Sequence, residues 1–445
     1  MSTVPRYRTP PFLPRKPTPD LGTQRISGER YYSPEFMQRE WTHVWTKVWN
    51  LGPRAHDIPE PGDFITHELG KESFVFVRGD DNVIRGFFNV CQHRGNQLCQ
   101  APLGSVSHFQ CPYHGWQWNI DGSLRQVADP QFFRQFDRGV PRDELALPPV
   151  KVALWGGWIW FNMDLAARSL EDYLGAIIPH LAPYEFEHWT LVDYRTFEFE
   201  SNWKHAVDAF NESYHFLALH PQTAGWAEGY DAANELLGIH NRMHQMVGTV
   251  SVKGPLGDAP SPELKVMMKD WLQIDPETYT GTAKDVYLEV RRRKRAVQDD
   301  TYLPYRQMND EQLSDLYHYT IFPNFILNIQ PEFGFLFRVR PHAKDPERCY
   351  YDHFLMQYLP PGTPQPTYEH RCFAAGEAPD FFVAFENKLD RSAADVQTQD
   401  ASNLEPIQRG CKSDSFKGAI LGEQEIGVRH FHQVLDGFLS GARTA

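Results

Sequence analysis

Apolar and polar residues recur with two different periods along this chain, and the first clear period predicts a helix. Over residues 33–49 (SPEFMQREWTHVWTKVW) the apolar positions have helical spacing. Ser33 is a favourable N-cap residue and Pro34 suits the first helical position. We therefore expect the helix to begin at this pair.

Shorter runs with the composition of strands follow this helix. Turn sequences such as Asp121-Gly122 separate them. The expected strands are 73–78 (SFVFVR), 83–90 (VIRGFFNV), 115–120 and, as the closing strand, 152–161 (VALWGGWIWF). Together they predict a small all-β domain over residues 45–165, preceded by an N-terminal arm and helix over residues 1–44 that join the second domain.

Residues 166–445 predict this second, larger domain. Residues 166–235 are expected to be mostly helical, apart from a strand over 190–200. Residues 222–318 carry no readable motif. Their basic run 289–295 (EVRRRKR) predicts a solvated helix face or, alternatively, a docking patch for a redox partner.

The pattern changes again in the last third of the chain. We expect strands over 325–329, 333–340 and 349–358, where strand-forming residues lie between turn sequences. Residues 381–445 are predicted to be helical, with a break near Pro406, because proline lacks the N–H that a helix interior needs.

Composition and charge narrow the class of protein. The 445 residues are 41% hydrophobic and 23% charged, as in ordinary globular proteins. A net charge of −13 makes nucleic acid an unexpected partner. Six cysteines form no disulfide framework, and no apolar run reaches membrane-span length, so we expect a cytoplasmic protein without membrane contact. The proline-rich first 19 residues predict an extended arm that lies on a neighbouring subunit or is disordered.

Two short segments of the β domain combine one cysteine and one histidine each. They are Cys91-Gln92-His93-Arg94-Gly95 and Cys111-Pro112-Tyr113-His114-Gly115. Two thiolates and two imidazoles in this asymmetric arrangement are the ligand set of a Rieske [2Fe–2S] cluster, in which two histidines replace two cysteines on one iron.

Structural zinc is the main alternative for these four residues. Zinc fingers usually place two cysteines in one half of the motif and two histidines in the other, whereas here both halves are mixed. Gly95 and Gly115 would also let backbone N–H groups approach the cluster sulfurs. Cys99 lies between the halves, and we interpret it as a packed or free thiol.

A second metal site is predicted within residues 202–220 (NWKHAVDAFNESYHFLALH). His215 and His220 would not share a face of a regular helix, but a π-bulge would bring them together. Asp208 and Glu212 precede His215 by seven and three positions, so either carboxylate could orient a histidine ligand.

A third ligand is expected from the C-terminal region. Apolar or small residues recur at Val396, Leu404, Ile407 and Cys411, and Asp400 lies on the same stripe. A carboxylate in an apolar stripe costs several kcal/mol unless it is paired or bound to a cation. Two histidines and one carboxylate form the facial triad of non-haem Fe(II) oxygenases, although a salt bridge for Asp400 remains open.

These motifs, in this order, resemble the α subunits of Rieske non-haem iron ring-hydroxylating oxygenases. The resemblance covers nearly the whole chain and includes CQHRG, CPYHGW, DASNLEPIQRG and the C-terminal VRHFHQVLDGFL. It implies an α+β fold, in which an all-β Rieske domain joins a helix-grip catalytic domain with an antiparallel sheet and a long C-terminal helix. It also implies homotrimers or α3β3 assemblies.

The resemblance implies a role for each candidate residue. Cys91 and Cys111 would bind one cluster iron, and His93 and His114 the other. The mononuclear iron would be held by His215, His220 and Asp400.

Two acidic residues remain as catalytic candidates. Glu212 matches the acid that bridges a cluster histidine of one subunit to an iron-binding histidine of the next. That acid is often aspartate, so Glu212 is one methylene longer here, and Asp208 is a second candidate. Asp208 also stands where some members have asparagine.

The expected activity is hydroxylation of an apolar aromatic, polycyclic or terpenoid-like substrate, by mono- or dioxygenation, as in the catabolism of aromatic hydrocarbons. O2 is the oxidant, and a separate ferredoxin or reductase supplies electrons from NAD(P)H, since the chain has no nucleotide-binding motif of its own. The expected pocket includes Phe210, Phe216, Leu217 and strand residues around 325–337.

Three alternatives stay open. The first is a monooxygenase or demethylase for methylated or quaternary amines, which would share all the metal ligands. The second is a Rieske electron-transfer protein without oxygenase activity. The third is a helix-grip ligand-binding protein with a vestigial metal site.

Overall fold

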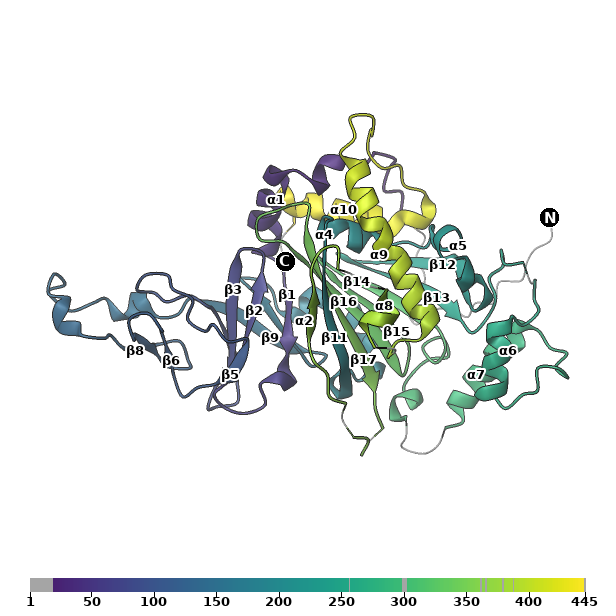
Figure 1. Cartoon of the computed structure of the whole chain (residues 1–445), viewed down its shortest axis with the longest axis horizontal. Coiled ribbons are helices and arrows are strands. Elements are labelled where there is room, and N and C mark those ends of the chain that lie inside the picture. Colours follow the sequence, from purple (N-terminus) through teal and green to yellow (C-terminus); the bar gives the residue numbers. More distant parts are fainter. Residues whose placement is uncertain are drawn as a thin grey trace. The chain divides into compact units, whose positions relative to one another are not determined.

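The computed structural model of the protein describes residues 19–443, except 256, 298–301, 361, 365, 378–379 and 387. The chain forms two compact units (Figure 1). One consists mainly of residues 38–173, and the other of the chain up to residue 37 with 174–341 and 345–440. The unit boundaries lie near the expected positions 44/45 and 165/166. Most of the expected N-terminal arm lies outside the described residues.

The smaller unit is built from β-strands. Its seven-stranded sheet has the order β1-β10-β9-β4-β3-β2-β5, and β6, β7 and β8 form a second sheet. The strands are β1 Asn50–Arg54, β2 Asp63–Leu69, β3 Glu72–Arg78, β4 Ile84–Phe88, β5 Leu103–Ser105, β6 Phe109–Gln110, β7 Gln117–Trp118, β8 Leu124–Gln126, β9 Pro149–Trp155 and β10 Trp158–Asn162. The strand expected over 115–120 is therefore reduced to β7.

Two local expectations for this region need correction. The expected helix 33–49 begins as predicted, with Ser33 Oγ accepting from Phe36 N at 3.1 Å, but α1 ends at Glu40 and a π-helical turn follows over Trp41–Trp45. The expected closing strand 152–161 is a hairpin of β9 and β10. Gly156 and Gly157 have φ values of 63° and 77°, and two such residues allow the tight turn that reverses the chain.

The larger unit contains an eight-stranded sheet of order β12-β13-β14-β15-β16-β17-β11-β18. Only the pairing of β11 with β18 is parallel. The strands are β11 Trp189–Phe199, β12 Ala227–Leu237, β13 His240–Val247, β14 Leu316–Ile321, β15 Phe325–Ile329, β16 Phe333–Pro341, β17 Cys349–Tyr358 and β18 Arg371–Phe373. The predictions for β11, β15, β16 and β17 are confirmed, whereas β12 contradicts the helical expectation for residues 227–235.

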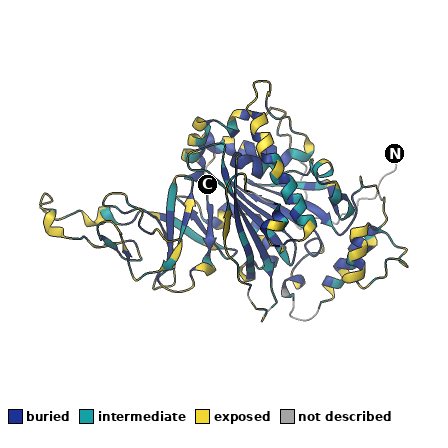
Figure 2. Cartoon of the chain, in the orientation of Figure 1, coloured by how far each residue is buried: buried dark blue, intermediate teal, exposed yellow. Residues whose placement is uncertain are grey.

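Helices cover one face of this sheet. They are α4 Trp203–Ala209, α5 Phe216–Leu219, α8 Phe381–Ala384, α9 Arg391–Cys411 and α10 Ile426–Leu439. The central strands are buried between their neighbours (Figure 2). The α+β fold class is thus confirmed. The other α-helices named for the larger unit or its border are α2 Leu170–Leu174, α3 Ile177–Leu181, α6 Pro262–Asp270 and α7 Ala283–Arg295.

Two helices differ from expectation. α9 continues through Pro406 without a break, since this proline lies on the exposed side where water can reach the carbonyl that lacks a partner. The basic run in α7 is not a fully solvated face. Arg291 and Lys294 are buried, and Asp315 and Glu332 pair with them. No helix of the described residues is long and apolar enough to cross a membrane.

The face of the sheet opposite α9 contains a buried ion-pair cluster around Asp352. Arg338 Nε and Arg340 Nε each lie 2.7 Å from its carboxylate, and Thr196 Oγ1 donates to it at 2.7 Å. Burial alone would raise the pKa of Asp352, but the two arginines and Thr196 lower it well below the usual range.

Asp352→Asn should lower the free energy of unfolding by about 3–5 kcal/mol, because it leaves the buried guanidinium group of Arg338 and the half-buried one of Arg340 without their anion. Folding lowers the pKa of Asp352. Its ion pairs therefore stabilise the protein fully above the pKa of the unfolded chain, about 3.9, and this stabilisation is lost as the pH falls below that value. Urea unfolding at several pH values should therefore give the variant a flatter acid dependence. Asp310→Asn, which removes an exposed partner of Arg295, should change stability by less than about 1 kcal/mol. Equal losses in both variants would contradict the prediction.

Candidate functional site

Two loops of the small unit share one backbone conformation. In each, the N–H of the glycine donates at 3.0 Å to the carbonyl of the cysteine four residues earlier, in the pairs Gly95–Cys91 and Gly115–Cys111. The two glycines have φ values of 73° and 72°, which favour glycine. The repeated Cys-to-Gly spacing therefore encodes two matching turns, each presenting one thiol.

Backbone N–H groups surround the two thiols. Those of Tyr113 and His114 point toward Cys111, and together with other donors they lower its pKa although burial opposes this. Burial raises the pKa of Cys91, while the N–H groups of the next loop residues act in the opposite direction. Donors aimed at sulfur suit thiolate ligands of a cluster. Burial raises the pKa of the Cys99 thiol to about 12, as fits a packed thiol.

The two histidines of these loops lie side by side. The ring centroids of His93 and His114 are 4.7 Å apart, and His93 stacks on Trp116 at 4.6 Å. The Nδ1 atom of His93 is buried without a hydrogen-bond partner. The sequence motif thus brings together two thiols and two imidazoles, with one imidazole nitrogen free for a metal, as the fit to a Rieske cluster requires.

The second candidate centre begins where α4 ends. The chain turns after Ala209 and forms the single turn α5, with His215 and His220 as its two flanking residues. The expected π-bulge between them is therefore wrong. His220 leaves the helical conformation, with φ −121° and ψ 55°, because a residue before proline disfavours it, and its ring lies 5.1 Å from that of His215.

Asp400 reaches these histidines from the middle of α9. The buried side of α9 contains Ala394, Gln397, Asp400, Leu404, Gln408 and Cys411. Asp400 and Leu404 lie on the buried side as expected, but Ile407 is exposed. Asp395 and Glu405 form exposed ion pairs within α9, so Asp400 is the carboxylate of this helix that faces the site.

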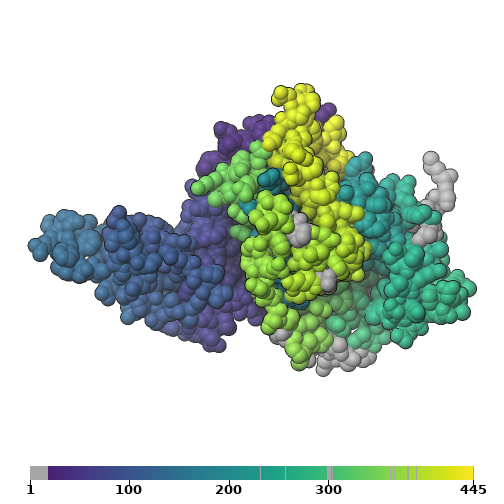
Figure 3. Space-filling model, in the orientation of Figure 1, coloured from purple at the N-terminus to yellow at the C-terminus, as the bar shows by residue number. Residues whose placement is uncertain are grey.

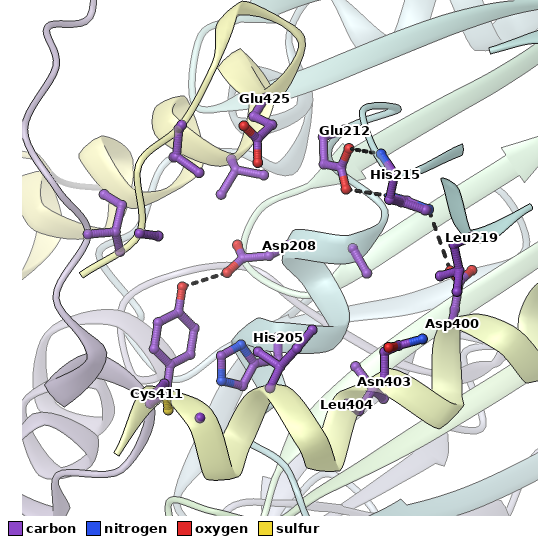
Figure 4. Close-up of a pocket in the computed structure, with 18 of the residues that line it drawn as sticks. His205, Asp208, Glu212, His215, Leu219, Asp400, Asn403, Leu404, Cys411 and Glu425 are labelled. Carbon is purple, nitrogen blue, oxygen red and sulfur yellow. Dashed lines mark hydrogen bonds and ion pairs between the residues drawn. The ribbon is translucent and has the colours of Figure 1, made fainter. Parts of the chain in front are cut away.

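Nitrogen and oxygen atoms of these three side chains converge on one point. All lie within 4.8 Å of one another. Asp400 Oδ1 is 2.9 Å from His220 Nε2. It is 3.5 Å from His215 Nε2, a contact drawn as a dashed line in Figure 4, and this nitrogen of His215 is buried without a hydrogen bond. A cation would stabilise this cluster of lone pairs, and two histidines with one carboxylate suit ferrous iron.

Two outer residues fix the orientation of the imidazoles. Glu212 Oε1 accepts from His215 Nδ1, and Gln399 Oε1 accepts from His220 Nδ1 at 2.7 Å. With both Nδ1 protons held there, both Nε2 lone pairs are available to a metal. Burial by itself would lower the pKa of His215, but the charges of Glu212 and Asp400 outweigh it and raise the pKa.

Asp208 belongs to a different cluster. Its Oδ2 accepts from Tyr31 Oη at 2.7 Å and lies 3.2 Å from His432 Nε2, and His205 stacks on Tyr31. Burial would raise the pKa of Asp208, but His432 and the other donors lower it. Of the two candidate acids, Glu212 is the one that contacts His215.

A cavity of about 630 Å³ lies over this region. Its lining includes His215 and Asp400 together with Asp208, Glu212 and Glu425, and no lysine or arginine. Figure 4 shows Glu212 between Glu425 and His215. In the space-filling view, the yellow-green surface around α9 forms one face of the larger unit (Figure 3).

The expected pocket residues do not line this cavity. Phe210 lines a smaller pocket next to Asp400, and Phe216 packs on the backbone of β12 near Gly229. Sequence reasoning missed Gln399, Tyr31, Glu425 and His432. For Gln399 the one signal in the sequence was its position directly before the predicted ligand Asp400. The other three residues come from distant segments, so no signal in the sequence pointed to them.

The fold and the two candidate centres define a two-domain non-haem iron protein of the Rieske type. The chain belongs to the ring-hydroxylating alpha subunit family: the model of that family's catalytic domain matches residues 186–441, and the Rieske [2Fe–2S] domain model matches residues 48–137. The family implies a Rieske cluster and a mononuclear iron, with O2 and reductant supplied from outside the chain.

Curated relatives include the carnitine monooxygenase oxygenase subunit of Escherichia coli K12, 34% identical over 43% of this chain and 51% of the relative. The glycine betaine monooxygenase oxygenase subunit of Chromohalobacter salexigens is 29% identical over 46% of this chain and 45% of the relative. The chloroplastic choline monooxygenase of Spinacia oleracea is 32% identical over 47% of this chain and 47% of the relative. The match thus spans about half the length of these relatives.

Solved structures share the fold over nearly the whole chain. The quaternary ammonium Rieske monooxygenase CntA with L-carnitine has a TM-score of 0.66 at 19% identity, covering 94% of this chain and 97% of that one. Naphthalene 1,2-dioxygenase from Rhodococcus has a TM-score of 0.62 at 19% identity, covering 93% and 94%.

Asp400→Ala should remove the carboxylate from the candidate iron site and leave the Rieske loops untouched. We expect the protein to lose about one iron per chain while its cluster spectrum is unchanged. Iron and acid-labile sulfide analysis with electron paramagnetic resonance would measure this. Asp395→Ala is the matched control on the exposed side of α9 and should keep all the iron. Full iron content in Asp400→Ala would overturn this ligand.

Proposed function

We propose that the chain is the oxygenase component of a Rieske monooxygenase that acts on a quaternary ammonium or methylated amine. The observation that carries the proposal is the substrate class of the relatives: carnitine, glycine betaine and choline are all quaternary ammonium compounds. This class was the alternative to the apolar ring substrate expected from sequence.

The electrostatics of the site support a cationic substrate. Four carboxylates line the cavity around His215 and no lysine or arginine does. A field of one sign raises the local concentration of the opposite charge and repels its own. Glu425 adds to this field, although burial followed by the charge of Glu212 raises its pKa.

In this proposal each metal-binding residue has one task. Cys91, Cys111, His93 and His114 hold the [2Fe–2S] cluster, and His215, His220 and Asp400 hold ferrous iron. When bound, the cluster supplies single electrons and the iron activates O2. Glu212 and Gln399 hold the Nδ1 protons of the two histidines.

The partners follow from the same assignment. A separate ferredoxin or reductase supplies the electrons, and the chain assembles as a trimer in which Glu212 connects the iron site to a neighbouring copy. Asp208 is a less suitable connector, since Tyr31 and His432 engage its carboxylate.

An apolar ring substrate is the second candidate. Phe210 lies 4.8 Å from Phe337 and 6.4 Å from Tyr351, so an aromatic group lies beside Asp400. The same rings also suit an ammonium group, because cations bind to aromatic faces. His215, His220 and Asp400 converge on one point, and a pure electron carrier would not need this second metal site.

Turnover with a surrogate reductase tests the proposed class. We expect product formation coupled to O2 consumption with at least one of carnitine, glycine betaine and choline, and none with naphthalene. Chromatography with mass spectrometry would identify the products, and about three irons and two sulfides per chain must be present beforehand. Naphthalene turnover without amine turnover would establish the second candidate instead.

Glu212→Gln should keep both metals, because an amide oxygen can still accept from His215 Nδ1. Loss of the charge should slow electron delivery, and we expect turnover to fall about tenfold or more. Glu425→Gln removes a neighbouring charge without contacting His215 and should have a much smaller effect. Single-turnover oxidation of the reduced cluster, followed by its visible absorbance, would measure the rate. Equal rates in Glu212→Gln and wild type would exclude Glu212 as the connector.

A further inference from the structure

Four uncharged polar side chains on strands β12 to β15 lie on the face of the large sheet that α4 and α9 cover, and each leaves at least one hydrogen-bonding atom without a partner. The unpartnered atoms are buried, and they are Asn234 Oδ1, Gln245 Nε2, Asn328 Oδ1 and both ring nitrogens of His318. Each such group costs about 1–3 kcal/mol when it stays unpaired, so a ligand that supplies the missing hydrogen bond is favoured there. We name these four residues the polar row.

The strand register places the polar row on one face. His318 of β14 pairs with Met243 of β13 and with Asn328 of β15, and Met243 pairs with Asn234 of β12. Directly paired residues of antiparallel strands point to the same side, and so does Gln245, two positions from Met243. His318 and Asn328 are therefore neighbours.

This face is the one that the iron site covers. Phe337 lies two positions from Phe335, the partner of Asn328, and its ring contacts Phe210 at the end of α4. His353, the partner of Phe337, bonds to Gln397 of α9 at 2.6 Å. α4 and α9 thus lie over the same face as the polar row.

His318 is the residue of the polar row whose pKa is affected by a metal ligand. Burial, followed by the nearby imidazole of His215, lowers the pKa of His318 to about 3. Among the described residues, no carboxylate is hydrogen-bonded or ion-paired to His318, so none favours its charged form. A neutral imidazole offers one donor and one acceptor.

Two arginines, one on a strand of the polar row and one on the neighbouring strand β16, point away from the row. Arg242 of β13 and Arg338 of β16 alternate to the opposite face, where Glu235 and Asp352 bind them at 2.8 and 2.7 Å. The row itself contains no lysine or arginine. An anion buried there would lack a counter-charge, which is strongly unfavourable, whereas a neutral hydroxyl or amide would match the free donors and acceptors.

We propose that the polar row binds the far end of the substrate, and that this end is an uncharged hydroxyl or amide rather than a carboxylate. This inference rests on the proposed function and narrows it: of the quaternary ammonium compounds, those with a neutral donor–acceptor group are preferred. His318 is a specificity-determining residue, because its neutral ring can either donate to a hydroxyl or accept from it.

Equilibrium binding to the full-length, metal-loaded protein tests the proposal without turnover. The probes are choline, glycine betaine and propyltrimethylammonium, which share a trimethylammonium group and end in a hydroxyl, a carboxylate and a methyl group. Each is also tested with one added methylene, so that length is not decisive. Isothermal titration calorimetry under anaerobic conditions should give a Kd for the best hydroxyl probe about tenfold or more below those of the matched alkyl and carboxylate probes.

His318→Leu should remove this preference. We expect its Kd for the hydroxyl probe to rise about tenfold, while the Kd for the alkyl probe stays within about threefold. His318→Gln, which keeps a donor and an acceptor, should retain part of the preference. Gln245→Leu is a second variant in case His318→Leu does not fold, and it should reduce the preference in the same direction. Met246→Leu, on the opposite face of β13, is the control, and iron content and cluster absorbance are measured for every variant.

The outcomes separate the two proposals. If the trimethylammonium probes bind equally well to the wild type, or His318→Leu weakens all of them alike, the polar row binds only water or maintains packing, and the inference is wrong while the proposed function stands. Tighter binding of the carboxylate probe would also overturn it. If no trimethylammonium probe binds, the proposed function fails and the inference fails with it.

Discussion

The catalytic unit depends on one geometric requirement: a carboxylate and two imidazoles, separated by up to 185 positions in the chain, must meet at one point. His220 and Asp400 lie 180 positions apart and 2.9 Å from each other. The short turn α5 carries the histidines, and the long helix α9 carries the carboxylate. Their lone pairs repel one another, so the protein must hold them by other contacts.

Those contacts come from residues that bind no metal themselves. Glu212 and Gln399 hold the Nδ1 protons, and Gln222 Nε2 donates to Gln399 Oε1 at 2.7 Å. Gln397, one turn earlier on α9, bonds to His353 of the sheet. α9 is therefore anchored to the sheet next to Asp400.

Sequence motifs gave the candidate metal ligands, because their spacing reflects local backbone geometry. The turns that present Cys91 and Cys111 repeat the same Cys-to-Gly spacing, and Asp400 stood out as a charge among apolar positions. The conformation between His215 and His220 could not be predicted in the same way. This conformation depends on where α4 ends and on Pro221. Both interrupt the helix, and a prediction from helical periodicity assumes that the helix is continuous.

Long-range pairings explain the other differences. The β9–β10 hairpin looked like one strand because the two glycines that reverse the chain lie inside an apolar run. β12 looked helical because its buried and exposed positions are interrupted by an irregularity in its pairing with β13. Tyr31 and His432 contact Asp208 although both lie far from it in the sequence, and no local sequence pattern predicts such a contact.

The large sheet separates two kinds of polar chemistry by the alternation of its strands. Charged residues such as Arg242 and Asp352 point to one face, where each has a counter-ion. Uncharged residues such as His318 and Asn328 point to the other face, where atoms remain unpaired. The ion pairs stabilise the unit whether or not a ligand is bound, whereas the unpaired atoms lower its stability until one is. On the face that the iron site covers, the unpaired atoms of the polar row are all uncharged, and a recognition surface for a neutral polar group requires such atoms.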